Sequence, residues 1–212
     1  MARVARGVVK LLLGLMIFVC LAITIIPPFL DRIYYTGPAS NHFDGARFFN
    51  PDGDDILGAP SGKSRGSFLL RWFTGRDGRS VWPDSIPVTP SKPAAKVDGD
   101  QMVVTWVGHA TVLIQTQGLN ILTDPIYADR AGPFGIGPKR VADSGVRFAD
   151  LPKIDLIVVS HNHYDHMDLT TLKRLWDRDK PLIVTSLGND TLINNAGARG
   201  VALDWGQRKT LR

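Results

Sequence analysis

The sequence predicts an α/β fold with a mixed sheet, preceded by a membrane-spanning helix. Three observations indicate this: an uncharged apolar run near the N-terminus, three β-branched runs after residue 101, and alternating strand-like and helix-like segments from there to the C-terminus. Antiparallel strands followed by a β-α-β-α-β order are typical of an α/β sheet with both kinds of neighbour. With 212 residues and 44% hydrophobic content, the chain suits one or two globular domains.

The charge of the chain limits the partners it could bind, and its cysteine content limits the ligands it could offer a metal. The net charge is +5, and the basic residues are spread without a run of five or six, so nucleic-acid binding is not expected. A basic balance is compatible with an anionic lipid surface. Cys20 is the single cysteine and lies in the apolar run, which excludes an internal disulfide and a thiolate zinc site. Any metal must therefore be held by nitrogen and oxygen.

Residues 8–30 are predicted to form a transmembrane anchor. Residues 11–30 carry no charge, and a helix over 8–26 would be about 28 Å long at roughly 1.5 Å per residue, close to the hydrocarbon thickness of a bilayer. Pro27 and Pro28 are expected to end this helix, because they lack the N–H that a helix interior needs. The segment is therefore expected to cross the membrane once.

The basic residues before the apolar run predict its orientation. By the positive-inside rule, they place the N-terminus in the cytoplasm and the remainder of the chain on the far side of the membrane. A cleaved signal peptide has the same polarity, but its apolar region is usually about 7–15 residues long and ends in small residues. A buried core helix is the other alternative, although it is rarely apolar on every face. The basic residues are Arg3, Arg6 and Lys10.

Residues 31–98 are predicted to form an irregular arm and a proline-rich connector. Gly-Pro and Asp-Gly pairs are strong turn signals. The aromatic side chains Phe43, Phe48 and Phe49 indicate that the arm packs against another part of the protein.

Residues 99–212 carry the α/β pattern, with Gln117-Gly118 as a hairpin turn. The segment after Ile154 is almost wholly apolar, as in a strand buried on both faces. Asp168 is a preferred type of N-cap residue for the first helix, and Gly197 is expected to stop the second. The expected strands are 102–108, 111–117, 119–125, 154–160, 181–187 and 201–205, and the expected helices lie within 168–179 and 189–200, the second ending before Gly197.

The stretch "SHNHYDHMD", residues 160–168, contains three of the five histidines and directly follows a predicted buried strand. Ligands of α/β sheets bind at the carboxyl ends of strands. If the chain stays extended, His161, His163 and Asp165 share one face, and His166 turns back. Imidazole and carboxylate suit a metal such as zinc, and four donors this close favour two adjacent ions. A solvated loop rich in imidazole is the alternative.

"HNHYDH" has the His-x-His-x-Asp-His form of the metallo-β-lactamase superfamily. Together with "HFDGARFFNP", "TWVGHATVLIQ" and "LTDPIYADRAGPFGIGPKRV", it resembles the N-acylphosphatidylethanolamine-hydrolysing phospholipase D family and its bacterial relatives, over residues 35–205. The resemblance implies an αβ/βα sandwich in which each half covers the inner face of the other. Only the N-terminal half is expected here, so the chain is expected to be a fragment with an open apolar face. A homodimer that covers this face is an alternative.

The resemblance also implies roles for individual residues. Two zinc ions are expected, one held by His161 and His163 and the other by Asp165 and His166, with Asp165 also counted as catalytic. His109, in "GHAT", matches a family motif, and its role is open between a hydrogen-bonded turn histidine and a part of the site. Asp124 is expected to support the metal loop without touching an ion, and Tyr164 is expected to face the head group of the substrate.

The expected function is a membrane-anchored zinc hydrolase that cleaves a phosphodiester bond of a phospholipid with water activated by the two ions. A lactone or ester hydrolase on the same fold is one alternative. An inactive truncated fragment is the other, because no histidine follows His166 to complete a two-metal site.

Overall fold

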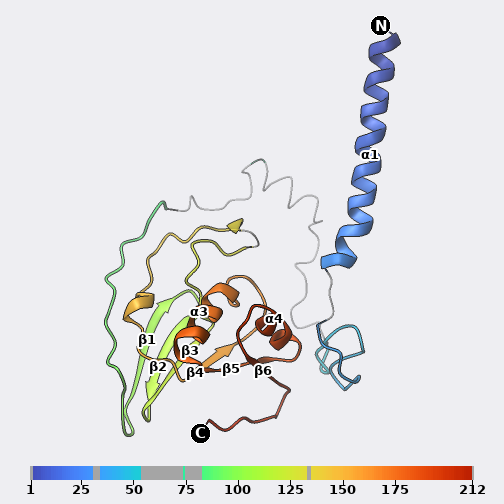
Figure 1. The fold of residues 1–212 in the computed structure, drawn as a ribbon. Helices are drawn as coiled ribbons and strands as arrows, with labels where there is room; N and C mark the ends of the chain where they lie inside the picture. The colour runs from blue at the N-terminus through green and yellow to red at the C-terminus, as the bar shows by residue number, and fades with distance from the viewer. Residues whose placement is uncertain (1, 31–33, 54–73, 75–82, 133–134, 212) are drawn as a thin grey trace.

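A computed structural model describes residues 2–30, 34–53, 74, 83–132 and 135–211 of the chain. The predicted irregularity of residues 54–73 lies outside the described residues. In Figure 1 a long N-terminal helix stands apart from a sheet that carries two helices on one side. The described chain thus has a separate N-terminal helix and one α/β layer structure.

The helix α1 (Ala2–Leu30) is exposed at almost every position of residues 4–26. It contains one segment long and apolar enough to cross a membrane, Val4–Ile26, with a mean hydropathy of 2.7 and no part buried. The expectation that Pro27 and Pro28 end the helix is wrong, because α1 continues to Leu30. A proline ring fixes φ near the helical value, and each proline removes only the one hydrogen bond that its missing N–H would donate, so a helix can continue for a turn beyond it.

One six-stranded sheet, with its strands in sequence order, forms the described domain, and the predicted mixed sheet is confirmed. The first three strands are antiparallel, and the others run parallel to the third. Gln117 and Gly118 have φ values of 50° and 73°, as a two-residue hairpin requires. The strands are β1 (Met102–Gly108), β2 (Thr111–Thr116), β3 (Leu119–Thr123), β4 (Leu156–Val159), β5 (Leu182–Ser186) and β6 (Gly200–Leu203).

The helices α3 (Leu169–Asp179) and α4 (Asn189–Asn195) follow β4 and β5, as predicted. The predicted N-cap is confirmed, because a carboxylate oxygen of Asp168 accepts a hydrogen bond from the Thr171 amide at 3.1 Å. The short 3-10 helix η3 (Phe148–Asp150) precedes β4. These connections place the histidine loop between the end of β4 and the start of α3.

The two faces of the sheet have different surroundings. One face packs against α3 and α4 and forms the core. On the other face Met102, Val104 and Trp106 are 58–64% exposed, and Val158 is also exposed. The expectation that β4 is buried on both faces is therefore wrong, because within the described residues helices cover only one side. The buried face contains Leu113, Leu122, Ile157, Val159 and Ile183 with Leu172, Leu175 and Ile193.

The aromatic arm, residues 34–53, packs against the α/β domain as its sequence predicted. Phe43 is only 2% exposed and lies between neighbouring rings, with centroid distances of 4.6 Å to Phe48 and 4.9 Å to Tyr35. The Thr191 hydroxyl of α4 lies 3.4 Å from the Tyr34 carbonyl oxygen, and His42 contacts Asp204 beyond β6. The arm is therefore fastened to the edge of the domain where α4 and β6 lie.

Candidate metal centre

Three turns of the chain meet at one edge of the sheet. Because β3 and β4 are parallel neighbours, Asp124 and Ser160 follow their carboxyl ends side by side, and the Asp124 amide donates to the Val158 carbonyl at 2.9 Å. The β1–β2 turn lies at the same edge, since Val112 pairs with Thr123. The sheet thus brings residues from three separate parts of the sequence together, as expected at the carboxyl edge of an α/β sheet.

Asp124 organises the loop that carries the histidines. Its carboxylate accepts hydrogen bonds from the Ser160 amide and the Ser160 hydroxyl, each at 2.7 Å. Its Oδ2 atom lies 2.9 Å from Nδ1 of His166. Asp124 is buried and has a left-handed φ of 35°, a conformation that aspartate tolerates better than most residues. It therefore anchors the end of β4 and fixes the orientation of the His166 ring.

His109 occupies the β1–β2 turn with a left-handed φ of 49°. Two buried or half-buried hydroxyls fasten this turn to the end of β3: the Thr111 hydroxyl donates to the Asp124 carbonyl at 2.7 Å, and the Thr123 hydroxyl donates to the Ala110 carbonyl at 2.8 Å. The His109 ring is held above the histidine loop as a result. The register of the β1–β2–β3 hairpins could have predicted the place of His109, because it puts the β1–β2 turn beside the carboxyl end of β3.

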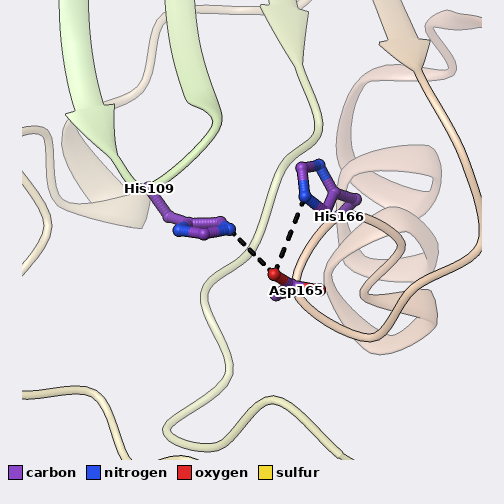
Figure 2. A group of neighbouring side chains, drawn as sticks. All are labelled: His109, Asp165 and His166. Carbon is purple, nitrogen blue, oxygen red and sulfur yellow. Dashed lines mark hydrogen bonds and ion pairs between the residues drawn. The ribbon is translucent and has the colours of Figure 1, made fainter. Parts of the chain in front are cut away.

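His109, Asp165 and His166 form a cluster whose nitrogen and oxygen donor atoms all lie within 4.8 Å of one another. Figure 2 shows the Asp165 carboxylate between the two rings, 2.9 Å from Nε2 of His109 and 3.7 Å from Nε2 of His166. Since Nδ1 of His166 faces Asp124, its Nε2 atom is the one directed at the cluster. A metal-binding histidine is typically held by its second nitrogen in this way.

The histidine loop forms a turn after β4. The His163 carbonyl accepts hydrogen bonds from the amides of His166 and Met167 at 3.0 and 2.8 Å. The expectation that His161, His163 and Asp165 alternate along an extended segment is therefore wrong, because these bonds fold residues 163–167 into a turn that contains Asp165. The turn nevertheless gathers the imidazoles: the His161 ring centroid lies 4.5 Å from that of His163 and 4.1 Å from that of His166.

The cluster shifts the pKa values of two of its members. Burial lowers the pKa of His161, and positive charge on His166 and His163 lowers it further. For Asp165, burial favours the protonated form, but its own backbone amide, the charge on His166 and the hydrogen bond from His109 outweigh burial and hold its pKa below the usual value. Both shifts favour the forms that bind a cation, a neutral imidazole and a carboxylate.

Asp168 has a larger part in the site than its predicted capping role. Its Oδ2 atom accepts from the amides of Tyr127 and Ala128 at 3.2 and 3.0 Å and from the Thr171 hydroxyl. It therefore joins the loop after β3 to the start of α3. Sequence reasoning missed this contact and the role of Ser160, because both depend on segments about forty residues apart.

Two hollows flank the histidine loop. Tyr164 is 56% exposed and lines a hollow of about 900 Å³ together with Tyr34 and Asn162. His161 lines a second hollow of about 610 Å³, in which Tyr34 and Asn162 recur. Of the predicted site residues, Tyr164 and His161 therefore border open space on either side of the loop.

The family model described as "Beta-lactamase superfamily domain" matches residues 103–210. An uncharacterized protein of Mycobacterium tuberculosis is 34% identical over 141 residues, which cover 60% of this chain and 38% of that protein. The N-acyl-phosphatidylethanolamine-hydrolyzing phospholipase D 1 of Caenorhabditis elegans is 47% identical over 75 residues, which cover 35% of this chain and 21% of the enzyme. The solved structure of a metallo hydrolase from Ignicoccus hospitalis aligns over 52% of this chain and 42% of that one, with 21% identity and a TM-score of 0.39.

Proposed function

Because this chain belongs to the family of the β-lactamase superfamily domain, we propose that it is the metal-binding part of a hydrolase that cleaves a phosphodiester bond in a phospholipid. The observation that carries the proposal is the cluster of His109, Asp165 and His166, with Asp124 behind it. The chain spans 38% of the Mycobacterium tuberculosis relative and 21% of the Caenorhabditis elegans enzyme. The activity is therefore proposed for the complete protein.

The donor set suits zinc. The donors are imidazole nitrogens and a carboxylate oxygen, and these are the ligands that zinc takes where thiolates are absent. One ion would be held by Asp165 and His166 with His109, and a second by His161 and His163. Bound zinc ions supply positive charge that polarises a phosphoryl group and lowers the pKa of water.

The protein's own residues prepare this site. Asp124 holds the His166 ring so that Nε2 faces the cluster. The hydrogen bond from His109 helps to keep the Asp165 carboxylate ionised and in place. Tyr164 is exposed beside the loop, and in the proposed function it would face the head group that leaves when the bond is cleaved. Pre-organised groups of this kind lose little freedom when a substrate binds.

Two further features favour a phospholipid as substrate. The similarity to the Caenorhabditis elegans enzyme, 47% over 75 residues, is to a protein named for hydrolysing N-acylphosphatidylethanolamine. The span Val4–Ile26 would anchor the catalytic domain at a membrane, with the N-terminus on the cytoplasmic side by the positive-inside rule. An anchored enzyme meets its lipid substrate at high local concentration.

Zinc content and hydrolysis test the proposal separately. The 212-residue chain is purified in detergent, equilibrated with zinc and desalted, and its metal content is measured by mass spectrometry. We expect bound zinc in the wild type and a strong reduction in His166→Ala. No bound zinc in the wild type would identify the chain as an inert fragment.

Hydrolysis is measured with the chain and, in parallel, with the longer Mycobacterium tuberculosis relative. The substrates are N-acylphosphatidylethanolamine in mixed micelles and a soluble lactone. Zinc-dependent release of phosphatidic acid by the longer relative, lost on chelation, is the expected result. Turnover of the lactone without phospholipid cleavage would overturn the proposed substrate in favour of an ester hydrolase.

A further inference from the structure

A second hollow, of about 610 Å³, separates the aromatic arm from the histidine loop. The arm supplies Tyr35, Arg47 and Phe48 to its wall, and His161 and Asn162 of the loop lie opposite. The ring of His161 lies 4.1 Å from that of His166, centroid to centroid. A ligand in this hollow would therefore contact the arm while it lies next to the metal cluster.

The charge of this hollow differs from that of its neighbour. Among the described residues that line it, Arg47 carries a permanent positive charge and no residue is acidic. The larger hollow contains Asp129 and Asp168 besides Arg130. Asp44 lies near Arg47 but outside the lining, and its carboxylate accepts from the backbone amides of Ala46 and Arg47 at 2.7 and 2.6 Å. The arm-side hollow therefore favours an anion.

We propose that the arm-side hollow binds the anionic phosphodiester of a phospholipid together with its glycerol side, with Arg47 as the charged contact and Phe48 as the apolar one. This inference rests on the proposed function. A phosphatidylethanolamine is a zwitterion, but acylation of its amine removes the positive charge and leaves one negative charge on the phosphate. A guanidinium without an acidic partner in the lining would therefore prefer the N-acylated lipid, because it has no ammonium group to repel.

The arm wall is fixed in place by contacts far apart in the sequence. Nε2 of His42 lies 2.8 Å from the Asp204 carboxylate, and the His42 ring stacks on Trp205 at 4.6 Å between centroids. At Gly188, which has a φ of 84°, an added Cβ would lie 3.2 Å from both the backbone nitrogen and Cβ of Tyr35. Glycine at this position lets the arm approach the start of α4 closely. Arg47 therefore lies on a wall whose position is fixed by these contacts.

The two hollows match the two substituents of a phosphodiester. Both touch Tyr34 and Asn162, so they adjoin each other beside the loop. The substituent that leaves as N-acylethanolamine would occupy the hollow of Tyr164, and the diacylglycerol side would occupy the hollow of Arg47. Tyr34, the first described residue after α1, lines both hollows.

Lipid binding by the metal-free protein tests this assignment without hydrolysis. The full chain in detergent micelles with chelator is mixed with radiolabelled N-acylphosphatidylethanolamine or phosphatidylethanolamine, and the lipid retained on gel filtration is measured. Arg47→Gln is compared with Arg199→Gln, because both arginines are exposed and Arg199 lines a hollow elsewhere on the domain. We expect Arg47→Gln to weaken binding of the N-acylated lipid about tenfold, as for loss of one charge-assisted hydrogen bond. Binding of phosphatidylethanolamine should change little, and Arg199→Gln should behave as wild type.

Equal binding by Arg47→Gln and wild type, or equal losses in the two arginine variants, would overturn the assignment. Inorganic phosphate is added as a competitor at millimolar concentration. Displacement of the lipid by phosphate would show a site for free phosphate and would also overturn it. If the binding pattern is as expected but the zinc-loaded longer relative hydrolyses no lipid, the proposed function fails while the binding site stands.

Discussion

Two histidine–carboxylate pairs in this protein have the same chemistry and different surroundings. At the carboxyl edge of the sheet, His166 lies 2.9 Å from Asp124, and at the arm His42 lies 2.8 Å from Asp204. The second nitrogen of His166 faces Asp165 and His109, whose side chains are 43% and 53% exposed. The second nitrogen of His42 lies 2.7 Å from the Asn41 side-chain oxygen. One pair leaves a ligand atom available, and the other uses both ring nitrogens.

Ring packing strengthens this difference. The His42 ring is buried and stacks on Trp205 and Phe48 at centroid distances of 4.6 and 6.3 Å. The His166 ring is surrounded by other imidazoles, those of His161 and His109. A histidine–aspartate pair therefore indicates a metal site only where the free nitrogen meets further donors in open space. The pair at the arm instead holds two segments together that are far apart in the sequence.

Loss of a metal ligand should have the largest effect. His166→Ala, His161→Ala and His163→Ala should each reduce zinc affinity at least about a hundredfold, because each removes a donor from the site. His42→Ala should leave zinc affinity unchanged. Isothermal titration with a competing chelator measures all four variants. Similar losses in His42→Ala and the other three would show that the histidine loop is not the metal site.

The reach of the Asp165 side chain should matter nearly as much. A carboxylate ligand must hold its oxygen about 2 Å from zinc, and Asp165→Glu lengthens the side chain by one methylene. We therefore expect Asp165→Glu to lose almost as much zinc affinity as Asp165→Ala. Full zinc content in the glutamate variant would mean that Asp165 acts only through its charge.

Replacing the carboxylate partner of His166 or of His42 compares the effects of the two histidine–aspartate pairs on zinc affinity. Asp124→Asn should lower zinc affinity about 10- to 100-fold, the usual effect of losing the partner that orients a metal-bound histidine. Asp204→Asn should leave zinc affinity unchanged, because its partner His42 takes no part in the cluster. Equal zinc affinity in both variants would contradict the role of Asp124.

Loss of the contact between His42 and Asp204 should be visible as faster proteolysis of the arm. His42→Ala removes the contact to Asp204 and the stacking on Trp205, worth about 1–3 kcal/mol for a buried hydrogen-bonded group. Trypsin cleavage after Arg47 should become about tenfold faster, because the arm detaches more often. His166→Ala serves as the control and should be cleaved at the wild-type rate. Unchanged cleavage of His42→Ala would mean that the aromatic contacts alone hold the arm.

The smallest expected effect is on the titration of His161. Burial and the neighbouring charges of His166 and His163 lower its pKa, so His166→Ala should raise the pKa of His161 toward its usual value. His161 is protonated less readily in the folded chain than in the unfolded chain. The protein therefore loses stability as the pH falls below the ordinary pKa of histidine, and it should lose less in the His166→Ala variant. Imidazole resonances of the metal-free protein measure the shift by NMR. His42→Ala should leave it unaltered.

Local sequence patterns were enough to predict most elements of the fold. The hairpin at Gln117-Gly118, the cap at Asp168 and the helix before Gly197 follow from short-range preferences that act within a few residues. The same holds for the apolar span at the N-terminus. The course of α1 through Pro27 and Pro28 was not predicted, because each proline removes one hydrogen bond but fixes φ near the helical value and need not end the helix at once.

The histidine stretch was recognisable because its donors are neighbours in sequence, but its geometry depends on distant segments. Asp124 and His109 meet the loop only because β3 and β4 are parallel neighbours and the β1–β2 turn lies at their shared edge. The exposure of Val158 likewise depends on which face the helices cover. Side-chain chemistry and local conformational preferences depend only on residues that are neighbours in the sequence. The partners of each donor are decided by strand pairing and by long-range side-chain contacts, which join residues up to 162 positions apart, as between His42 and Asp204.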